Sequence, residues 1–400
     1  MEEWKQYRLI DVLDTLIDYR GKTPKKTSSG VPLITAKIIK NGRIETPTEF
    51  ISVDDYDSWM VRGFPKVGDV VLTTEAPLGE VAQLDDANIA LAQRVVTLRG
   101  KSDVLDNTYL KYYFLSNVGQ QRLKARETGT TVTGIKQSEL REVIVDVPPY
   151  EMQVGIAKVL KSLDDKIEVN RRINENLEQQ AQALFKSWFV DFEPFENGEF
   201  VESELGMIPK GWKLKRIYEY VDVIYGAPYK SSLFNDNKEG LPLIRIRDLK
   251  TNTPQFHTPE ILPNTEYIEA GDIVAGMDAE FTPYVWQGER GVLNQRCCKF
   301  KGKYEGISNY YILFLVKPEL EYVQSYKTGT TVSHLGKSDI DRFVFLTPPL
   351  DIVLAFSEIV NPMIKEVVNR AKESCRLAEL RETLLPKLMS GELKVNELNI

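Results

Sequence analysis

The sequence predicts an α+β protein that contains the same unit twice, each copy being a mixed globular region followed by a long helix. A loop sequence, TGTTV, begins at Thr128 and again at Thr328, a step of 200 residues. A Pro-Pro pair recurs with the same step, as Pro148-Pro149 and Pro348-Pro349. After each pair, apolar residues follow the four-three alternation that is typical of coiled coils. Two copies imply two similar sites, and so long a period argues against a solenoid, which stacks many short units.

Other matches between the copies have slightly larger offsets, as small loop insertions would produce. They are Trp4 and Arg8 with Trp212 and Arg216, Gly30, Pro32, Leu33 and Ile34 with Gly240, Pro242, Leu243 and Ile244, and Gln93-Arg94 with Gln295-Arg296. Between them lie short apolar runs bounded by Gly, Pro, Asn or Asp, which indicate short strands and turns. Each globular region is therefore predicted to mix short strands with short helices.

Each predicted long helix carries one narrow apolar stripe. The stripes are Ile156, Leu160, Leu163, Ile167, Asn170, Asn174, Leu177, Ala181, Leu184 and Trp188, and then Phe356, Val360, Met363, Val367, Arg370, Ser374, Leu377, Arg381, Leu384 and Leu388. Such helices must pair, and the simplest partner for each is the other, antiparallel and holding the globular regions apart. Asn170 and Asn174 are predicted to lie near Arg370 and Ser374 and to fix the register.

Two segments depart from this regular pattern. Pro362 and Pro386 each remove an intrahelical hydrogen bond, so the second helix is predicted to be kinked or broken near its ends. The acidic stretch that follows the first helix could be a solvated linker. It is nevertheless rich in aromatic residues, which predicts docking on the helices or on another subunit. These residues are Trp188, Phe189, Phe192 and Phe195.

Composition bounds the class of protein. With 400 residues and 42% hydrophobic content, the chain can bury two substantial cores. Its three cysteines have neither disulfide nor metal-ligand spacing, which predicts a reducing, cytoplasmic setting without zinc. The acidic start Met1-Glu2-Glu3 and the absence of a long apolar run predict a protein that is neither exported nor membrane-spanning.

A net charge of −7 speaks against nucleic-acid binding, but the distribution of charge qualifies this. Arg20 to Arg43 contains seven basic residues in 24 and no acidic one. A second acid-free stretch runs from Arg290 to Lys303. Either stretch alone is as consistent with a solvated loop as with a binding surface. Their occurrence in both copies favours the binding surface.

Three patterns that would indicate catalysis are incomplete or absent in this sequence. Gly336-Lys337-Ser338 resembles the end of a Walker A loop, but Thr331 stands where that loop needs glycine. An amino-methyltransferase needs Asn or Asp directly before Pro-Pro, and Asp146 is one residue out of register. Acidic residues pair at no diagnostic spacing for a metal-dependent nuclease. The residues therefore predict a two-headed binder and scaffold.

Several segments resemble the specificity (S) subunits of type I restriction-modification systems. They are PPYEMQ at Pro148, ALFKSWFVDF at Ala183, LGMIPKGWK at Leu205 and LLPKLMSGEL at Leu384, in the order and spacing of that family over essentially the whole chain. PPLDIV at Pro348 is a weaker copy of the first. The resemblance implies two pseudo-symmetric target-recognition domains separated by two long antiparallel helices that form a coiled coil.

The expected boundaries follow from the repeat and the resemblance. They are target-recognition domain 1 at 1–148, conserved helical spacer 1 at 149–190, the linker and target-recognition domain 2 at 191–346, and conserved helical spacer 2 with the C-terminal tail at 347–400. Each domain would read one half of an interrupted site in double-stranded DNA. The helices would recruit two methyltransferase subunits that bind S-adenosylmethionine, so this chain would hold no cofactor or metal and no catalytic residue. Motor-nuclease subunits would complete a restriction enzyme.

The candidate DNA contacts are basic and polar residues of the globular regions. In the first domain, Lys22, Lys25 and Lys26 are predicted to bind phosphates, and Thr35, Lys37 and Lys40 to lie closer to base edges. In the second domain the candidates are Tyr229, Lys230, Arg245 and Arg247. Arg94 and Arg296 belong to a Gln-Arg pair that both copies share. Domains that read different sequences should not share base-reading residues, so this pair is predicted to be structural or to contact phosphate.

Two alternatives remain open at this stage. One is a single-chain modification enzyme, which methyl transfer by the isolated chain would reveal. The other is a protein scaffold that only borrows the coiled coil, for which replacing Lys22 and Lys25 by Glu would leave the function of the complex intact.

Overall fold

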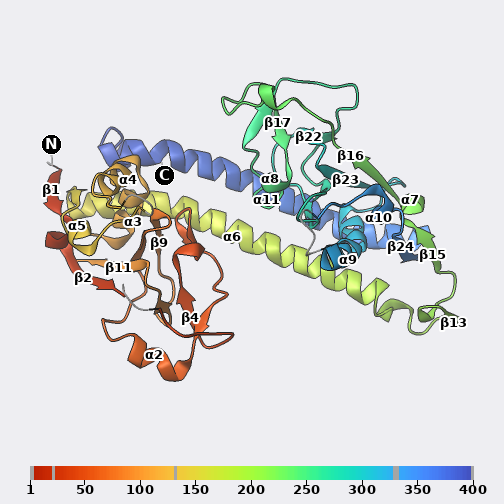
Figure 1. The fold of residues 1–400 in the computed structure, drawn as a ribbon, viewed down its shortest axis with the longest axis horizontal. Helices are drawn as coiled ribbons and strands as arrows, with labels where there is room; N and C mark the ends of the chain where they lie inside the picture. Colours follow the sequence, from red (N-terminus) through yellow and green to blue (C-terminus); the bar gives the residue numbers. More distant parts are fainter. Residues whose placement is uncertain (1–3, 20–22, 130–132, 328–332, 398–400) are drawn as a thin grey trace. The chain divides into compact units, whose positions relative to one another are not determined.

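The computed structural model describes residues 4–19, 23–129, 133–327 and 333–397. The chain folds into two compact units. Unit 1 comprises Met1–Lys166 and Leu377–Ile400, and unit 2 comprises Ile167–Arg376. Each unit therefore contains one globular region and a part of both long helices (Figure 1).

Unit 1 is built from short strands and helices that precede the first long helix. In order they are β1 Lys5–Arg8, α1 Leu9–Val12, β2 Leu13–Asp18, β3 Lys26–Thr27, β4 Val31–Ile34, η1 Ala36–Ile38, β5 Ile39–Lys40, β6 Arg43–Ile44, β7 Phe50–Ile51, α2 Val53–Trp59, β8 Val70–Thr74, β9 Leu78–Gln83, β10 Ala90–Leu91, β11 Val95–Gly100, α3 Asn107–Leu115, α4 Asn117–Lys124, α5 Gln137–Arg141 and β12 Ile144–Val147. A 3-10 turn, η4 Val395–Glu397, ends the described part of the unit.

Unit 2 repeats much of this order after the first long helix. Its elements are η2 Glu193–Phe195, β13 Phe200–Ser203, β14 Gly206–Pro209, β15 Lys213–Arg216, α7 Ile217–Tyr220, β16 Val221–Tyr225, η3 Ser231–Leu233, β17 Leu241–Ile244, α8 Ile246–Leu249, β18 Phe256–Thr258, β19 Tyr267–Ile268, β20 Ile273–Gly276, β21 Pro283–Val285, β22 Gly291–Leu293, β23 Cys297–Gly302, α9 Asn309–Lys327, α10 Lys337–Ile340 and β24 Val344–Thr347.

One four-stranded sheet and two strand pairs correspond between the two units. A four-stranded sheet has the order β2-β11-β8-β9 in unit 1 and β16-β23-β20-β21 in unit 2. A parallel pair joins β4 to β10 and β17 to β22, and an antiparallel pair joins β1 to β12 and β15 to β24. Helix α3 packs on β8, β9 and β11, as α9 packs on their counterparts β20, β21 and β23. This confirms the predicted α+β fold with two pseudo-symmetric globular regions.

The acid that directly precedes β8 in unit 1, and its counterpart before β20 in unit 2, each form an ion pair, although the partner differs. Asp69 is 1% exposed and accepts two hydrogen bonds from Arg99 of β11, both 2.7 Å long. Its counterpart Asp272 lies 2.8 Å from the ammonium group of Lys299 in β23. A buried carboxylate needs such a partner to offset the loss of its hydration. Both sheets thus contain this ion pair, but the basic residue is Arg99 in unit 1 and Lys299 in unit 2, which lie at different positions of the equivalent strands.

The long helices α6 (Tyr150–Phe189) and α11 (Leu350–Ser390) are paired within each unit (Figure 1). In unit 1, the buried stripe residues Leu160 and Leu388 belong to the same apolar cluster. In unit 2, Asn170 contacts Ser374, whereas Asn174, one turn later, contacts Val367. Partner numbers fall as α6 advances, so the helices are antiparallel, as predicted.

The predicted polar positions of the seam do form a layer in unit 2. The amide of Asn170 donates to Glu373 at 2.7 Å and to Ser374 at 3.3 Å. Its carbonyl oxygen accepts from Arg370 at 3.2 Å. Asn170 is fully buried, so a slip of one turn would leave its amide without these partners. The interpretation that these residues fix the register is therefore supported by their contacts.

The structure settles the two irregular segments. Helix α11 continues through Pro362 and Pro386, so a break at either proline is wrong, while the kink that was the other expectation stays a prediction. Each proline removes only one backbone donor, and apolar packing on both sides of Pro362, by Val360 and Ile364, holds the helix in place. The aromatic residues after α6 dock within unit 2, where Phe189, Phe192 and Phe195 surround Trp212 at ring distances of 5.1–6.0 Å.

Candidate nucleic-acid interface

The shared Gln-Arg pair of unit 1 lies where three segments of the globular region meet. The nitrogen of Thr74, the last residue of β8, donates to the carbonyl of Arg94 at 3.0 Å. The nitrogen of Ile135 donates in turn to the carbonyl of Thr74 at 2.9 Å, which brings in the segment after TGTTV. The nitrogen of Ala92 donates to the carbonyl of Ile34 at 3.0 Å, which brings in the end of β4.

Unit 2 repeats these three backbone contacts. Met277 N donates to the carbonyl of Arg296 at 2.8 Å, and Leu335 N donates to that of Met277 at 2.7 Å. Asn294 N donates to the carbonyl of Ile244 at 3.0 Å. We call this arrangement the Gln-Arg corner of each unit. It consists of the Gln-Arg pair, the end of β4 or β17, the last residue of β8 or the residue after β20, and the segment after TGTTV. Thr130–Val132 and Thr328–Val332 of the two TGTTV motifs lie outside the described residues.

Each shared arginine pairs with an acid that the sequence analysis missed. Arg94 Nε lies 2.7 Å from Glu75, and Arg296 Nη1 lies 3.1 Å from Asp278. The two arginine side chains remain 48% and 58% exposed, so each keeps donors directed to solvent. Each shared arginine is thus held by an ion pair, and its contact with a phosphate stays a prediction. The acids precede the arginines by similar distances in the two copies, which is the signal that could have identified them.

The first basic loop of unit 1 reaches the corner through Thr23. Its hydroxyl lies 3.4 Å from the side-chain oxygen of Gln93. Lys25, two residues later, is exposed. Lys26 is also exposed but forms an ion pair with Glu49 at 2.8 Å. The third candidate of this loop, Lys22, lies outside the described residues.

The remaining candidates of unit 1 divide into two groups. Thr35 directly follows Ile34 and therefore lies at the corner, where it is partly exposed. Lys37 is exposed in η1, and Lys40 is exposed on the short hairpin of β5 and β6 that follows, which packs on β9. Lys40 forms an exposed ion pair with Glu45 at 3.2 Å. The structure thus brings Thr35 and the loop of Lys25 to Arg94, and places Lys37 in η1 and Lys40 on the hairpin that follows.

In unit 2, Lys230 and Arg247 are exposed, whereas Tyr229 is not. Tyr229 is only 6% exposed, and its hydroxyl donates to Thr265 at 3.0 Å. It packs in an apolar cluster with Ala227 and so does not lie among the exposed contacts. Tyr229 was chosen from the segment that corresponds to the candidates of unit 1, but local sequence cannot distinguish a surface position from a core position. We therefore withdraw Tyr229 as a candidate DNA contact.

Arg245 is the counterpart of Thr35, because each follows the last residue of the strand that meets the corner. Its side chain is 18% exposed and lies 3.4 Å from the buried carboxylate of Asp248. It also stacks over Phe256 at 4.5 Å and donates to Gln255 at 3.1 Å. Burial raises the pKa of Asp248, and the charge of Arg245 opposes that rise. Arg245 is therefore held in a fixed direction, as direct base recognition requires.

One difference between the corners concerns the segment after TGTTV. In unit 1 this position is Gly134, which lies against Glu75 in an isolated bridge. In unit 2 it is His334, whose Nδ1 lies 2.6 Å from Asp278. Asp278 thus joins His334 to Arg296. In unit 1 the position of His334 is taken by Gly134, which has no side chain to bond to Glu75. The backbone of the corner is shared while the exposed side chains differ.

The residues that the structure describes contain no group of three or more His, Cys, Asp or Glu side chains placed to hold a metal ion. Over the same residues, none of the helices has the length and apolar character that a membrane crossing needs.

Comparison with known proteins gives a consistent result. A family model described as the type I restriction modification DNA specificity domain matches residues 1–179 and 209–372. The type I restriction enzyme MjaIX specificity subunit of Methanocaldococcus jannaschii is 31% identical, over 99% of this chain and 95% of that protein. The HindI specificity subunit of Haemophilus influenzae is 22% identical, over 98% and 100%.

A solved structure supports the fold. The type I restriction-modification S subunit of M. genitalium superposes with a TM-score of 0.55 at 16% identity, over 96% of each chain. The family model covers most of the chain in two stretches, one for each globular region and its long helix. The duplicated α+β fold, the antiparallel helices and these matches together show that the chain belongs to the family of type I restriction-modification DNA specificity subunits.

Proposed function

We propose that unit 1 and unit 2 each read one half of an interrupted, asymmetric DNA sequence. The observation that carries this proposal is the pair of Gln-Arg corners, which share backbone contacts and differ in side chains. A shared backbone would present each corner to the same feature of the duplex, the phosphates beside a groove. Different side chains at equivalent positions, Thr35 and Arg245 or Gly134 and His334, would then select different bases.

We also propose that the long helices recruit two methyltransferase subunits and that this chain supplies no catalytic group. The relatives named above are specificity subunits, which supports a non-catalytic role. The net charge of −7 fits a chain whose partners provide much of the positive surface around the duplex. S-adenosylmethionine would be held by the methyltransferase subunits, and motor-nuclease subunits would add ATP-dependent cleavage.

A first prediction concerns the phosphate contacts of unit 1. In the assembled methyltransferase complex, Lys25→Ala is expected to weaken binding to all DNA sequences alike. It should also reduce the slope of log affinity against log salt by about one, because one fewer counterion is released. Affinity would be measured by fluorescence anisotropy over a salt series.

The matched control is Lys66→Ala in the same unit. Lys66 is also exposed, but it precedes β8, whereas the Gln-Arg corner lies at the other end of that strand. This variant should leave the salt slope unchanged. Equal salt slopes for the wild type and Lys25→Ala would show that Lys25 does not contact a DNA phosphate.

A second prediction concerns base recognition by unit 2. Arg247 is exposed in α8, two residues beyond Arg245. If it reads a guanine, Arg247→Ala should cost about 1–3 kcal/mol of discrimination at one base pair and relax only the half-site read by unit 2. Methylation of a library of single-base site variants measures this directly. Relaxation in both half-sites, or in neither, would contradict the assignment.

A further inference from the structure

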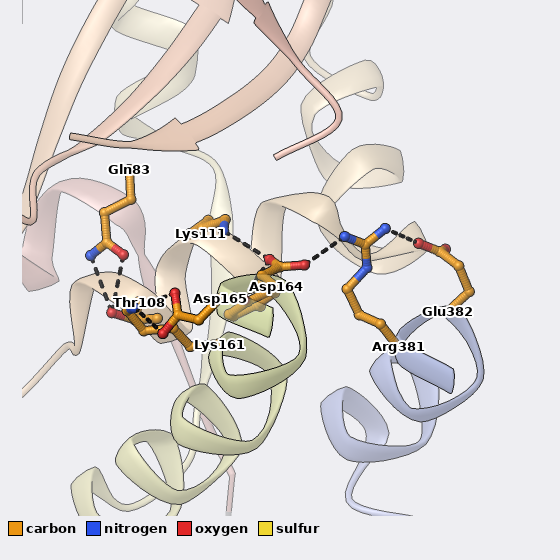
Figure 2. Close-up of polar contacts among 9 residues, drawn as sticks. Gln83, Thr108, Lys111, Lys161, Asp164, Asp165, Arg381 and Glu382 are labelled. Atoms are coloured by element: carbon orange, nitrogen blue, oxygen red, sulfur yellow. Dashed lines mark hydrogen bonds and ion pairs between the residues drawn. The ribbon is translucent and has the colours of Figure 1, made fainter. Parts of the chain in front are cut away.

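A buried charged cluster joins the globular part of unit 1 to both long helices (Figure 2). The carboxylate of Asp164 in α6 accepts from Lys111 at 3.0 Å and from the hydroxyl of Tyr112 at 2.6 Å, both on α3. Its other oxygen accepts from Arg381 of α11 at 2.6 Å. Lys111, Asp164 and Arg381 have side chains only 10%, 18% and 20% exposed. We call these four residues the Asp164 cluster.

Unit 2 has apolar residues at all four equivalent positions. Alignment of Asn107 with Asn309 at the starts of α3 and α9, and of the two Pro-Pro pairs, identifies the counterparts. They are Leu313 for Lys111, Phe314 for Tyr112, Ile364 for Asp164 and Ala181 for Arg381. All four are at most 8% exposed and belong to one apolar cluster. The same junction is thus built from charges in unit 1 and from apolar side chains in unit 2.

The two kinds of junction differ in how strictly they fix geometry. Hydrogen bonds to a carboxylate require defined distances and angles, and a buried charge that loses them is costly. Apolar contacts are non-directional and tolerate small shifts. An apolar junction in unit 1 would stabilise the fold equally well, because replacing a buried ion pair with apolar residues is often neutral or stabilising. Stability alone therefore does not account for the Asp164 cluster.

A continuous series of contacts leads from the cluster to the Gln-Arg corner of unit 1. Helix α3 carries Lys111 and, one turn earlier, Thr108 (Figure 2). Thr108 exchanges hydrogen bonds of 3.1 and 3.2 Å with Gln83 of β9. Strand β9 pairs with β8, and β8 ends at Thr74, which bonds to Arg94. A rotation of α3 on the long helices would therefore displace the corner.

We propose that the Asp164 cluster consists of positioning residues that fix the seating of the unit 1 reader on the helix pair, and with it the gap accepted between the two half-sites. This inference rests on the proposed function, because it presupposes that both units read DNA. The residues do not touch DNA themselves. They limit the gaps between half-sites at which the Gln-Arg corner of unit 1 can bind DNA while unit 2 is also bound.

The test replaces the cluster with its unit 2 counterparts in the full chain, assembled with its methyltransferase subunits. The variant is Lys111→Leu, Tyr112→Phe, Asp164→Ile and Arg381→Ala together. Thermal unfolding and the methylation of sites with gaps shorter or longer by one base pair are both measured. We expect wild-type stability, unchanged half-sites, and a rise of about tenfold in methylation at the altered gaps, equivalent to about 1.4 kcal/mol of lost discrimination.

Arg381→Ala alone provides the same test if the fourfold variant does not fold, because Asp164 keeps Lys111 and Tyr112. This variant should also increase methylation of sites whose gap is shorter or longer by one base pair. A folded variant that accepts only the wild-type gap overturns the inference and leaves the proposed function standing. A wild-type chain that directs methylation to no bipartite site would instead refute the proposed function.

Two controls separate positioning from general loss of stability. Leu98→Ala removes a fully buried side chain from β11 of the same unit, and should destabilise the chain without broadening the gaps. Lys161→Ala removes an ion pair with Asp165 on α6, one turn before the cluster, whose side chains are 50% and 59% exposed (Figure 2). It should change neither measurement. Broadening in the Leu98→Ala variant would show that the gap depends on stability alone, and would overturn the inference.

Discussion

Asp164→Ala is expected to lower the free energy of unfolding by about 3–5 kcal/mol, because it leaves the nearly buried charge of Lys111 without its partner. Arg381 loses the same carboxylate and keeps only the exposed Glu382. Chemical denaturation of the full chain measures the loss. Hydrogen–deuterium exchange should show that it begins in α3 and the adjoining turns of α6.

The neighbouring Asp165 provides a matched control for this prediction. It is the same residue type on the same helix, but its ion pair with Lys161 is exposed. Asp165→Ala should therefore cost no more than about 1 kcal/mol. If the two variants lose equal stability, the cluster has no special energetic role.

The same carboxylate should make unit 1 sensitive to acid. Burial alone would raise the pKa of Asp164, but Lys111, Tyr112 and Arg381 outweigh burial and hold the pKa below its ordinary value. The folded-state pKa is therefore lower than the unfolded value of about 3.9. The stabilising contribution is present above the unfolded pKa and is lost as pH falls through the folded one.

A comparison of the wild type with Asp164→Asn tests this dependence, since asparagine does not titrate. The stability difference between the two should be constant near neutral pH and should shrink as the pH falls below about 4. Denaturation curves over that range measure it. A difference that does not change with pH would show that Asp164 contributes through packing rather than through its charge.

Phe356→Ala should be equally costly in unit 2. Phe356 is fully buried in α11, and its ring lies 5.0–6.1 Å from those of Phe185, Trp188 and Phe189 of α6. Truncation would leave a cavity among these rings and cost about 3–5 kcal/mol. Denaturation followed by tryptophan fluorescence would report the loss, because Trp188 belongs to the cluster.

The control for this variant lies on the same turn of α11. Ile359 is 45% exposed, so Ile359→Ala removes little buried surface. It should change the free energy of unfolding by less than about 1 kcal/mol. A small loss for Phe356→Ala would mean that the aromatic cluster collapses to fill the cavity.

The sequence was most informative where a pattern repeats. The offset between the Pro-Pro pairs and the alternation after them predicted both long helices, their antiparallel pairing and the polar layer at Asn170. Those features depend on residues close together in the chain or on a comparison of the two copies. The helix does not break at Pro362, because a lost backbone hydrogen bond is outweighed by packing that the sequence does not show.

The candidate site was harder to predict because its contacts are distant in sequence. Arg94 was recognised from the repeat, but its partner Glu75 was not, since acids are frequent and only the similar spacing of acid and arginine in the two copies marks this one. Tyr229 was chosen from the segment that corresponds to the candidates of unit 1, and it is buried. The Asp164 cluster joins residues separated by 53 and 217 positions. No local pattern reveals such a cluster.

The central claim is that each unit reads its own half-site, and a segment exchange tests it most directly. Residues from Lys213 in β15 to Thr347 in β24 would be replaced with the corresponding segment of another specificity subunit. Methylated adenines would then be mapped in a host carrying the complete system. We predict a bipartite site in which one half changes, while the other half and the gap stay as in the wild type. A change in both halves, or a single uninterrupted site, would contradict the claim.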